Sequence, residues 1–173
     1  MKRRYLEIDV FGAEPSRGNA LGVVLDCEGL SSEAMQEFAA WTNFSETTFV
    51  FPPKAIAADY KVRIFTPTRE LPFAGHPTLG SCFAWLQGGN KPSDPNLVVQ
   101  ECAAGLIEIR KDGKSLSFKS PALIKYGPIE TALISEIAEV LNIDQAKIID
   151  SHWLDNGPGW VGVLLSSVDE VLA

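Results

Sequence analysis

Runs of alternating apolar and polar residues recur along this chain from Tyr5 to Lys119, and two segments of helical spacing interrupt them. Strict alternation is the period of a half-buried strand, whereas apolar residues three or four positions apart share one face of a helix. The dipeptide Asp112-Gly113 separates the last two runs and is a strong signal for a two-residue hairpin turn. The pattern therefore predicts two strands before the first helix and a mostly antiparallel meander after the second.

Two motifs lie where these helices meet their neighbours. The first helical segment ends at Asn43 and a strand over 47–51 follows, which places Glu46 at the mouth of that strand. Pro77 suits the first position of the second helix, so His76 is expected near its N-cap. N–H groups at a helix start lack intrahelical partners and attract anions. A carboxylate, an imidazole and an anion-binding helix start are together half of a proton-transfer site.

The composition narrows the classes of partner. With 46% hydrophobic and 21% charged residues, the 173-residue chain has the composition of a soluble globular protein. Its net charge of −7 disfavours nucleic acid and anionic membranes, because both attract basic surfaces. Cys27, Cys82 and Cys102 form no CxxC pair and have only two histidines to join them, so we expect neither a disulfide framework nor a metal site. A small-molecule partner fits best.

No segment has the pattern of a signal peptide or a membrane span. Glu7 and Asp9 interrupt any apolar run after the basic amino terminus. No stretch approaches the roughly 20 apolar residues that cross a bilayer. We therefore expect a cytoplasmic protein with no membrane partner.

The C-terminal part contains few predicted elements. Residues 121–128 are interpreted as a connector, and apolar residues at helical spacing follow from Leu133 to Leu141. Strands are predicted at 147–150 and 160–165, and a capped helix over 166–171. One helix and two strands bury too little surface for an independent core. We expect this second unit to be incomplete.

Five segments of the chain resemble, in order, motifs of the phenazine-biosynthesis PhzF-like family, which has the diaminopimelate-epimerase fold. These segments are Asp9–Phe11, Gly18–Val24, Met35–Val50, Arg63–Pro67 and Glu70–Gly80. The resemblance implies an α+β fold of two similar lobes, each a curved, mainly antiparallel sheet around a central helix, with the active site in the cleft between them. It places the first lobe at residues 1–124, and a connector with an incomplete second lobe at 125–173.

The later part of the family's pattern is only partly present. Gly157–Val163 resembles a strand early in the family's second lobe, although Asn156 stands where some members have Thr. The motif Glu-Asp-Pro-Ala-Thr-Gly, which in the family carries a second acidic residue of the site, is absent. We therefore expect a family member that is truncated in its second lobe.

The resemblance also implies a chemistry. In the family, a glutamate at the position of Glu46 is the general acid/base that moves a proton on a cyclic dihydroxy-diene acid or a similar substrate, without metal or cofactor. A carboxyl group suits this task when a partly apolar pocket raises its pKa toward the working pH, and Phe44 and Phe49 are expected to contribute such surroundings. For His76 the resemblance implies a hydrogen bond to the substrate or assistance in proton transfer.

Substrate contacts are implied for four residues beside this pair: Ser45, Gly75, Pro77 and Thr78. Taken without the resemblance, Glu46 also fits a surface carboxylate and His76 a capping or packing histidine. Ser45 equally fits a cap for local backbone groups, and Gly75 a tight turn before the helix. Gly18-Asn19 is interpreted as shaping the loop that enters a strand.

Two functions follow from these features. The first is a PhzF-like isomerase that acts on a small anionic substrate. The second is a truncated, non-catalytic family member that serves as an interaction module or needs a second chain to complete its site. An unfinished core leaves apolar surface exposed, so we expect either a homodimer or a complementing chain that carries the second lobe.

Overall fold

The computed structural model describes residues 2–113 and 115–172. Its strands are β1 (Tyr5–Val10), β2 (Asn19–Val24), β3 (Glu46–Phe51), β4 (Tyr60–Phe65), β5 (Glu70–Leu71), β6 (Leu97–Cys102), β7 (Gly105–Asp112), β8 (Ser115–Phe118), β9 (Lys125–Pro128), β10 (Asp150–Asp155) and β11 (Val161–Leu164). Its helices are α1 (Ser32–Thr42), α2 (Gly75–Gln87), α3 (Thr131–Leu141) and α4 (Val168–Leu172), with a 3₁₀ turn at Gln145–Lys147. The chain divides into two units, the first ending at Pro121 and the second beginning at Ala122.

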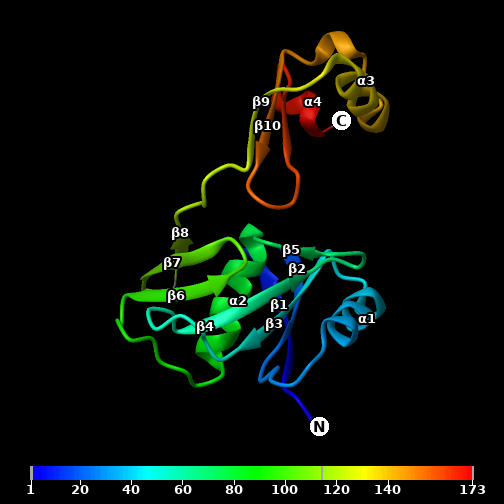
Figure 1. Ribbon diagram of the computed structural model, residues 1–173. Coiled ribbons are helices and arrows are strands. Elements are labelled where there is room, and N and C mark those ends of the chain that lie inside the picture. Colours follow the sequence, from blue (N-terminus) through cyan, green and yellow to red (C-terminus); the bar gives the residue numbers. More distant parts are fainter. Residues whose placement is uncertain (1, 114, 173) are drawn as a thin grey trace. The chain divides into compact units, whose positions relative to one another are not determined.

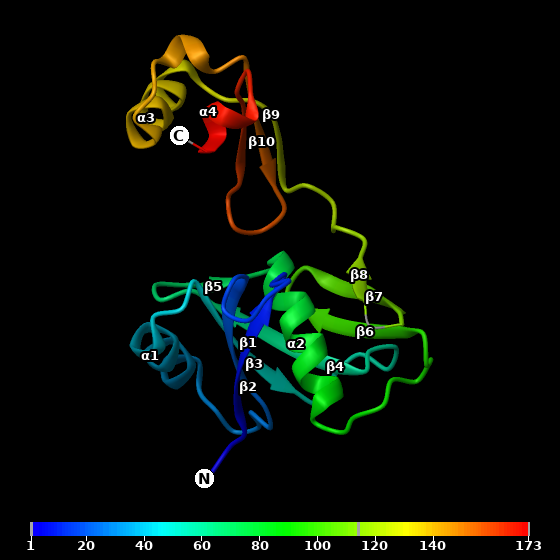
Figure 2. The same cartoon turned by 180° about the vertical axis from the view of Figure 1, so that it is seen from behind.

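The first unit is a curled, mixed sheet around one helix. Its strands lie in the order β1-β2-β3-β4-β6-β7-β8, with β5 paired to β4. Among the described residues, five pairs of neighbouring strands are antiparallel, and two pairs, β2 with β3 and β4 with β6, are parallel. The sheet curls around α2 (Figure 1), and the view from behind shows this helix lying along its inner face (Figure 2). The predicted α+β arrangement is confirmed for this unit.

The main core lies between α2 and the inner face of the sheet. The helix is buried along much of its length, including Gly80, Ser81 and Cys82. A Cβ atom on Gly80 would lie 2.5 Å from Leu21 Cδ2, a separation that carbon atoms do not adopt without displacement. Glycine at this position therefore lets the helix approach the sheet closely.

α1 covers the opposite face of β3 and β4. Its start and end follow the sequence signals: Ser31 accepts a hydrogen bond from a first-turn N–H, and Asn43 ends the helix in the left-handed region with φ of 57°. Met35 and Ala39 of the helix pack in a second apolar cluster with Phe49. α1 and α2 therefore bury two different faces of the same sheet.

The alternation of side chains along β3 separates Glu46 from Phe49. Thr48 points toward α2, where its Oγ1 accepts a hydrogen bond from Ser81 Oγ at 2.8 Å. Glu46 lies two positions from Thr48 and shares that side, whereas Phe49 lies in the α1 cluster. The expectation that Phe49 lines the surroundings of Glu46 is therefore wrong.

The second unit contains a three-stranded antiparallel sheet ordered β11-β10-β9. Residues 125–128, expected within a connector, form β9, because β10 supplies backbone hydrogen-bond partners that the local pattern does not reveal. Residues 147–150 do not form the predicted strand. Instead, Asp144 accepts a hydrogen bond from Ala146 N at 2.9 Å and begins a 3₁₀ turn, and β10 starts only at Asp150.

The last predicted helix is present as α4, and Ser167 Oγ accepts a hydrogen bond from Glu170 N at 3.2 Å at its start. Likeness of the second unit to the first lobe stays a prediction. Within residues 2–113 and 115–172, no helix combines the length and apolar character needed to cross a membrane.

Candidate active site

The candidate site forms at one edge of the curled sheet. β2 and β3 run parallel, and Leu21 lies beside Glu46 in their register, so both strands begin at this edge. The first turn of α2 reaches the same place and carries His76. The two side chains predicted to be catalytic are brought together, with His76 Nε2 lying 3.4 Å from Glu46 Oε2.

The two facing side chains are almost completely withdrawn from solvent. Their exposed fractions are 10% for His76 and 12% for Glu46. Although the two atoms are close, their contact lacks the geometry of a hydrogen bond, and neither Glu46 Oε2 nor His76 Nε2 has another hydrogen-bond partner. Buried polar atoms without partners are rare and call for an explanation. A bound polar group that bridges them is one such explanation.

Burial sets the charge of the imidazole. Loss of hydration lowers the pKa of His76 below its ordinary value, and the nearby Glu46 carboxylate opposes this effect only in part. The imidazole is therefore neutral at neutral pH. At the 3.4 Å contact a carboxylate therefore faces a neutral ring, and the contact is not an ion pair.

Asn19 joins the pair, although the sequence interpretation had given it only a loop role. Its side-chain amide lies 3.2 Å from His76 Nδ1. Ser45 Oγ donates a hydrogen bond to Asn19 Oδ1 at 3.4 Å. Asn19 therefore links Ser45, which is exposed, to the imidazole that faces Glu46. The signal available in the sequence is its place in the Gly18–Val24 segment, which resembles a motif of the family.

The loop before Asn19 is held by a single carboxylate. Asp9 accepts hydrogen bonds from Ser16 N at 2.7 Å and Gly18 N at 2.8 Å. A Cβ atom on Gly18 would lie 2.2 Å from the backbone oxygen of Val10, so this close approach requires glycine. The expected loop-shaping role of Gly18 is thus seen directly, and it fixes where Asn19 begins β2.

The start of α2 lies where the sequence predicts an anion-binding element, and anion binding there stays a prediction. The helix begins at Gly75, and its N-cap residue, Ala74, supplies no side-chain hydrogen bond to the first turn. Gly75 is tightly packed as well, since a Cβ atom there would lie 3.3 Å from Phe118 Cζ. Pro77 is buried at the third helical position, two residues later than its predicted place.

Thr78 lies inside the fold. Its hydroxyl donates to the backbone oxygen of Ala74 at 2.9 Å and accepts from Gln100 Nε2 at 3.1 Å. Gln100 in turn accepts a hydrogen bond from Tyr60 at 2.8 Å. Thr78, Gln100 and Tyr60 are fully buried. This chain of hydrogen bonds steadies the first turn of α2, and the Thr78 hydroxyl is occupied within it.

The fold is that of an α+β protein with a curled mixed sheet, and at one edge of the sheet a carboxylate faces a neutral imidazole. Across the described residues, no group of three or more His, Cys, Asp or Glu side chains is arranged to hold a metal ion. Residues 8–173 match the PhzC-PhzF family model, described as phenazine biosynthesis-like protein. The chain belongs to this family.

Several relatives of this chain are named as isomerases. An uncharacterized isomerase from Mesorhizobium japonicum is 55% identical over 164 residues, which cover 94% of this chain and 47% of the relative. A trans-2,3-dihydro-3-hydroxyanthranilate isomerase from Pseudomonas aeruginosa is 43% identical over 114 residues, covering 64% of this chain and 39% of the relative. Both relatives carry the word isomerase in their names, and each is matched over less than half of its length.

The solved structures agree with this assignment. The crystal structure of a PhzF-family phenazine biosynthesis protein from Bacillus anthracis superposes with a TM-score of 0.74 at 25% identity. The superposition covers 99% of this chain and 58% of that protein. The chain spans about half the length of the curated relatives it matches.

Proposed function

We propose that this chain supplies the acid–base side of an isomerase that moves a proton on a small carboxylic acid. The observation that carries the proposal is the facing pair of Glu46 and His76, which is buried, 3.4 Å apart and unsatisfied in its hydrogen bonding. A substrate placed against this pair gives both atoms a partner. Perturbed or unpartnered titratable groups in such a setting are candidates for proton transfer.

The proposed reaction keeps atoms and electrons in balance. The Glu46 carboxylate takes a proton as a C–H bond of the substrate breaks, and the electron pair of that bond moves into the adjoining conjugated system. The protonated carboxyl group then returns a proton to a different carbon of the same molecule. His76, as a neutral ring, donates a hydrogen bond from Nε2 and holds the reacting group in place. The reaction written in this way requires no metal and no redox cofactor, and we propose that none takes part.

The proposed substrate is anionic. Gly75 and His76 present the uncapped start of α2, where free N–H groups and the helix dipole favour a carboxylate. Ser45 is exposed beside this start and offers a further hydroxyl. Pro77 and Thr78 shape the first turn from inside, since both are buried. We therefore assign the substrate carboxylate to Gly75 and His76, with Ser45 as a secondary contact.

The name of the Pseudomonas aeruginosa relative suggests a first probe. We propose trans-2,3-dihydro-3-hydroxyanthranilate, hereafter the probe acid, as a member of the substrate class. It combines a carboxylate with a C–H bond next to a conjugated system, which are the two features that the site requires.

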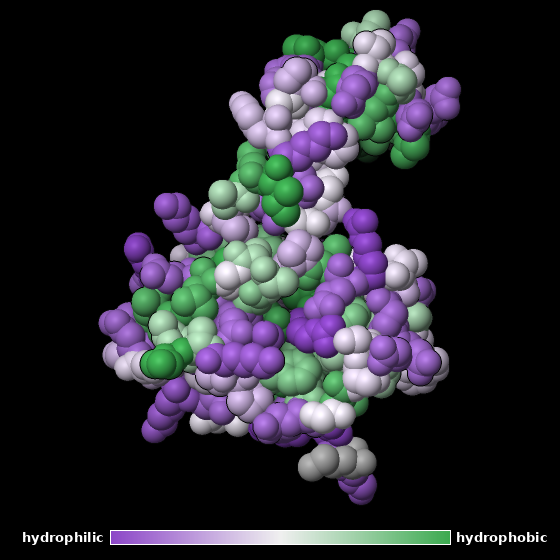
Figure 3. Space-filling view, in the orientation of Figure 1, coloured by the Kyte–Doolittle hydropathy of each residue, from purple (hydrophilic) through white to green (hydrophobic). Residues whose placement is uncertain are grey.

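We also propose that activity needs residues beyond those described. Closed sites exclude water and hold reacting atoms near attack geometry, and this chain matches about half of its relatives' length. Apolar side chains lie exposed in the second unit, including Val140, Val168 and Val171, and apolar surface is visible around α3 (Figure 3). These features support association with a second copy or with a chain that supplies the remaining part.

The proposal predicts the behaviour of two proteins. The first is this chain alone, and the second is a chimera of this chain followed by the remaining C-terminal part of the Mesorhizobium japonicum relative. We expect the chimera to isomerise the probe acid and to keep its rate after treatment with a metal chelator, whereas the chain alone has little activity. The measurement is the rate of probe-acid conversion, with oligomeric state followed by light scattering. Equal activity of a monomeric 173-residue chain would contradict the need for a second part.

A further inference from the structure

Four side chains form an unbranched series across the candidate site: Ser45, Asn19, His76 and Glu46. Ser45 Oγ meets Asn19 Oδ1 at 3.4 Å, the Asn19 amide meets His76 Nδ1 at 3.2 Å, and His76 Nε2 meets Glu46 Oε2 at 3.4 Å. The proposed reaction uses the last contact. The first two have no assigned role.

The series has only two self-consistent arrangements of protons, because each amide and each neutral ring has one donating and one accepting end. In one arrangement, Ser45 donates to Asn19, Asn19 donates to His76 Nδ1, and the proton on Nε2 faces Glu46. In the other arrangement every donor is reversed, the ring proton lies on Nδ1, and the lone pair of Nε2 faces Glu46. The orientation of the Asn19 amide therefore decides which nitrogen of the imidazole is a donor.

The charge of Glu46 selects between these arrangements. An unprotonated Nε2 would point its lone pair at the carboxylate, which is unfavourable, whereas an N–H at this position faces it favourably. Asn19 Oδ1 accepts from Ser45 in this arrangement, which leaves Nδ2 to donate to His76 Nδ1. The hydroxyl of Ser45 can serve in either arrangement, so Glu46 is the end that discriminates, and it favours the amide orientation present in the structure.

We propose that Asn19 is a positioning residue that holds His76 in the tautomer with its proton on Nε2, facing Glu46. The inference deepens the proposed function, since this tautomer is the one that gives the site a neutral acid beside its base. Which nitrogen of an imidazole carries the proton is set by the hydrogen bond at the other nitrogen.

The backbone around Asn19 is fixed in position, which suits a positioning role. Asp9 fixes the preceding loop through the N–H groups of Ser16 and Gly18, and Asn19 is the first residue of β2. The side-chain amide of Asn19 therefore contacts the imidazole from a backbone that Asp9 holds in place. The side chain itself is exposed, so substitutions there remove the contact without opening the core.

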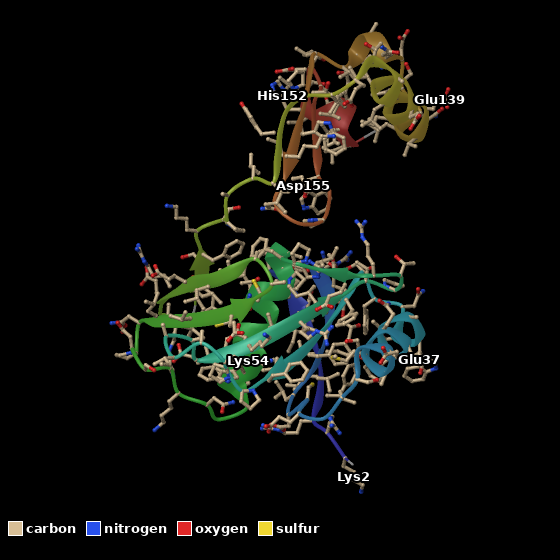
Figure 4. All side chains as sticks on the ribbon, viewed as in Figure 1. Lys2, Glu37, Lys54, Glu139, His152 and Asp155 are labelled. Carbon is tan, nitrogen blue, oxygen red and sulfur yellow. The ribbon has the colours of Figure 1, made fainter. Side chains whose placement is uncertain are left out.

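The test reads the tautomer directly and needs no substrate. Long-range proton–nitrogen NMR spectra distinguish protonated from unprotonated ring nitrogens, and they are recorded on the 173-residue chain at a pH well above the pKa of His76. The chain has two histidines, and His152, on β10 of the second unit (Figure 4), is the internal control. The variants are Asn19→Asp, Asn19→Ala and Ser45→Ala, with thermal unfolding recorded for each.

We expect the wild-type ring to be protonated on Nε2. In Asn19→Asp the carboxylate can only accept, so the proton moves to Nδ1 and the Nε2–H signal of His76 is lost. Asn19→Ala gives a mixture of both tautomers, and Ser45→Ala shifts the population in the same direction by less. The His152 signals stay unchanged in all three variants.

The inference is overturned if the wild-type ring carries its proton on Nδ1, or if Asn19→Asp keeps the wild-type tautomer while unfolding at the wild-type temperature. If an Asn19 variant unfolds below the wild-type temperature, Ser45→Ala is used in its place. An unchanged tautomer population in Ser45→Ala would also overturn the inference. Because no turnover is measured, an inactive chimera would contradict the proposed isomerase without altering these outcomes.

Discussion

Replacing Glu46 by Gln in the chimera is expected to lower kcat for the probe acid by about 10³-fold, within the range that a positioned acid–base group contributes. Gln keeps the size and shape of the side chain but can neither take nor return a proton. Burial of the position, at 12% exposed, keeps solvent from substituting for the lost carboxylate. The measurement is steady-state conversion of the probe acid, with the folded state verified by circular dichroism.

A matched substitution controls for the chemical change. Glu37→Gln makes the same replacement on the exposed surface of α1 (Figure 4), and we expect its kcat to equal that of the parent chimera. Should Glu46→Gln retain more than about a tenth of the parent kcat, a proton-transfer role for Glu46 would be ruled out, because general acid–base groups contribute at least about 10²-fold.

Replacing Gly80 by Val is expected to produce the second large effect, on stability. The first added carbon would already lie 2.5 Å from Leu21 Cδ2 and 2.9 Å from Val10 Cγ2. Leu21 is completely buried and Val10 nearly so, hence neither side chain has room to move away. Overpacking of this kind lowers the free energy of unfolding by about 1–3 kcal/mol. Urea unfolding of the 173-residue chain, followed by circular dichroism, measures the loss.

The same helix provides the control for Gly80→Val. Gln87 is exposed in the last turn of α2, and Gln87→Val introduces the same side chain where nothing is crowded. We expect a change within about 0.5 kcal/mol there, as for most surface substitutions. Equal stability of Gly80→Val and the parent chain would show that α2 does not approach the sheet as closely as described.

Local signals in the sequence were sufficient for most elements of the first unit. Ser31 and Asn43 bound α1 because their side-chain and backbone preferences act within one turn of the helix. Leu97–Cys102 is a strand, as its apolar and β-branched residues indicate, and alternate residues along it are buried. β9 was missed because its formation depends on pairing with β10, which no local pattern encodes.

The site required more than local signals. Glu46 and His76 meet because β2 and β3 pair in parallel and α2 starts at their common edge, and this depends on the order of strands in the sheet. The helix and strand signals place both residues at element boundaries and the motif resemblance implies their roles, but neither shows that the two side chains meet. Asn19 was missed for the same reason, since its contact with His76 spans β2 and α2.

One error could have been avoided from the sequence. Phe49 lies on the predicted strand over 47–51, and Glu46 at its mouth is three positions away. This odd separation places the two side chains on opposite faces once the extended backbone includes Glu46. Phe49 is accordingly found in the α1 cluster, away from the side that Glu46 shares with Thr48.

The central claim is that Glu46 and His76 work as one unit, and a double-mutant cycle tests it most directly. The measurement is kcat/KM of the chimera for the probe acid with Glu46→Gln, His76→Gln and both substitutions together. Groups that act as a unit have non-additive effects, so we predict that the double variant is no slower than Glu46→Gln alone. A double variant whose loss equals the product of the two single losses would contradict the account.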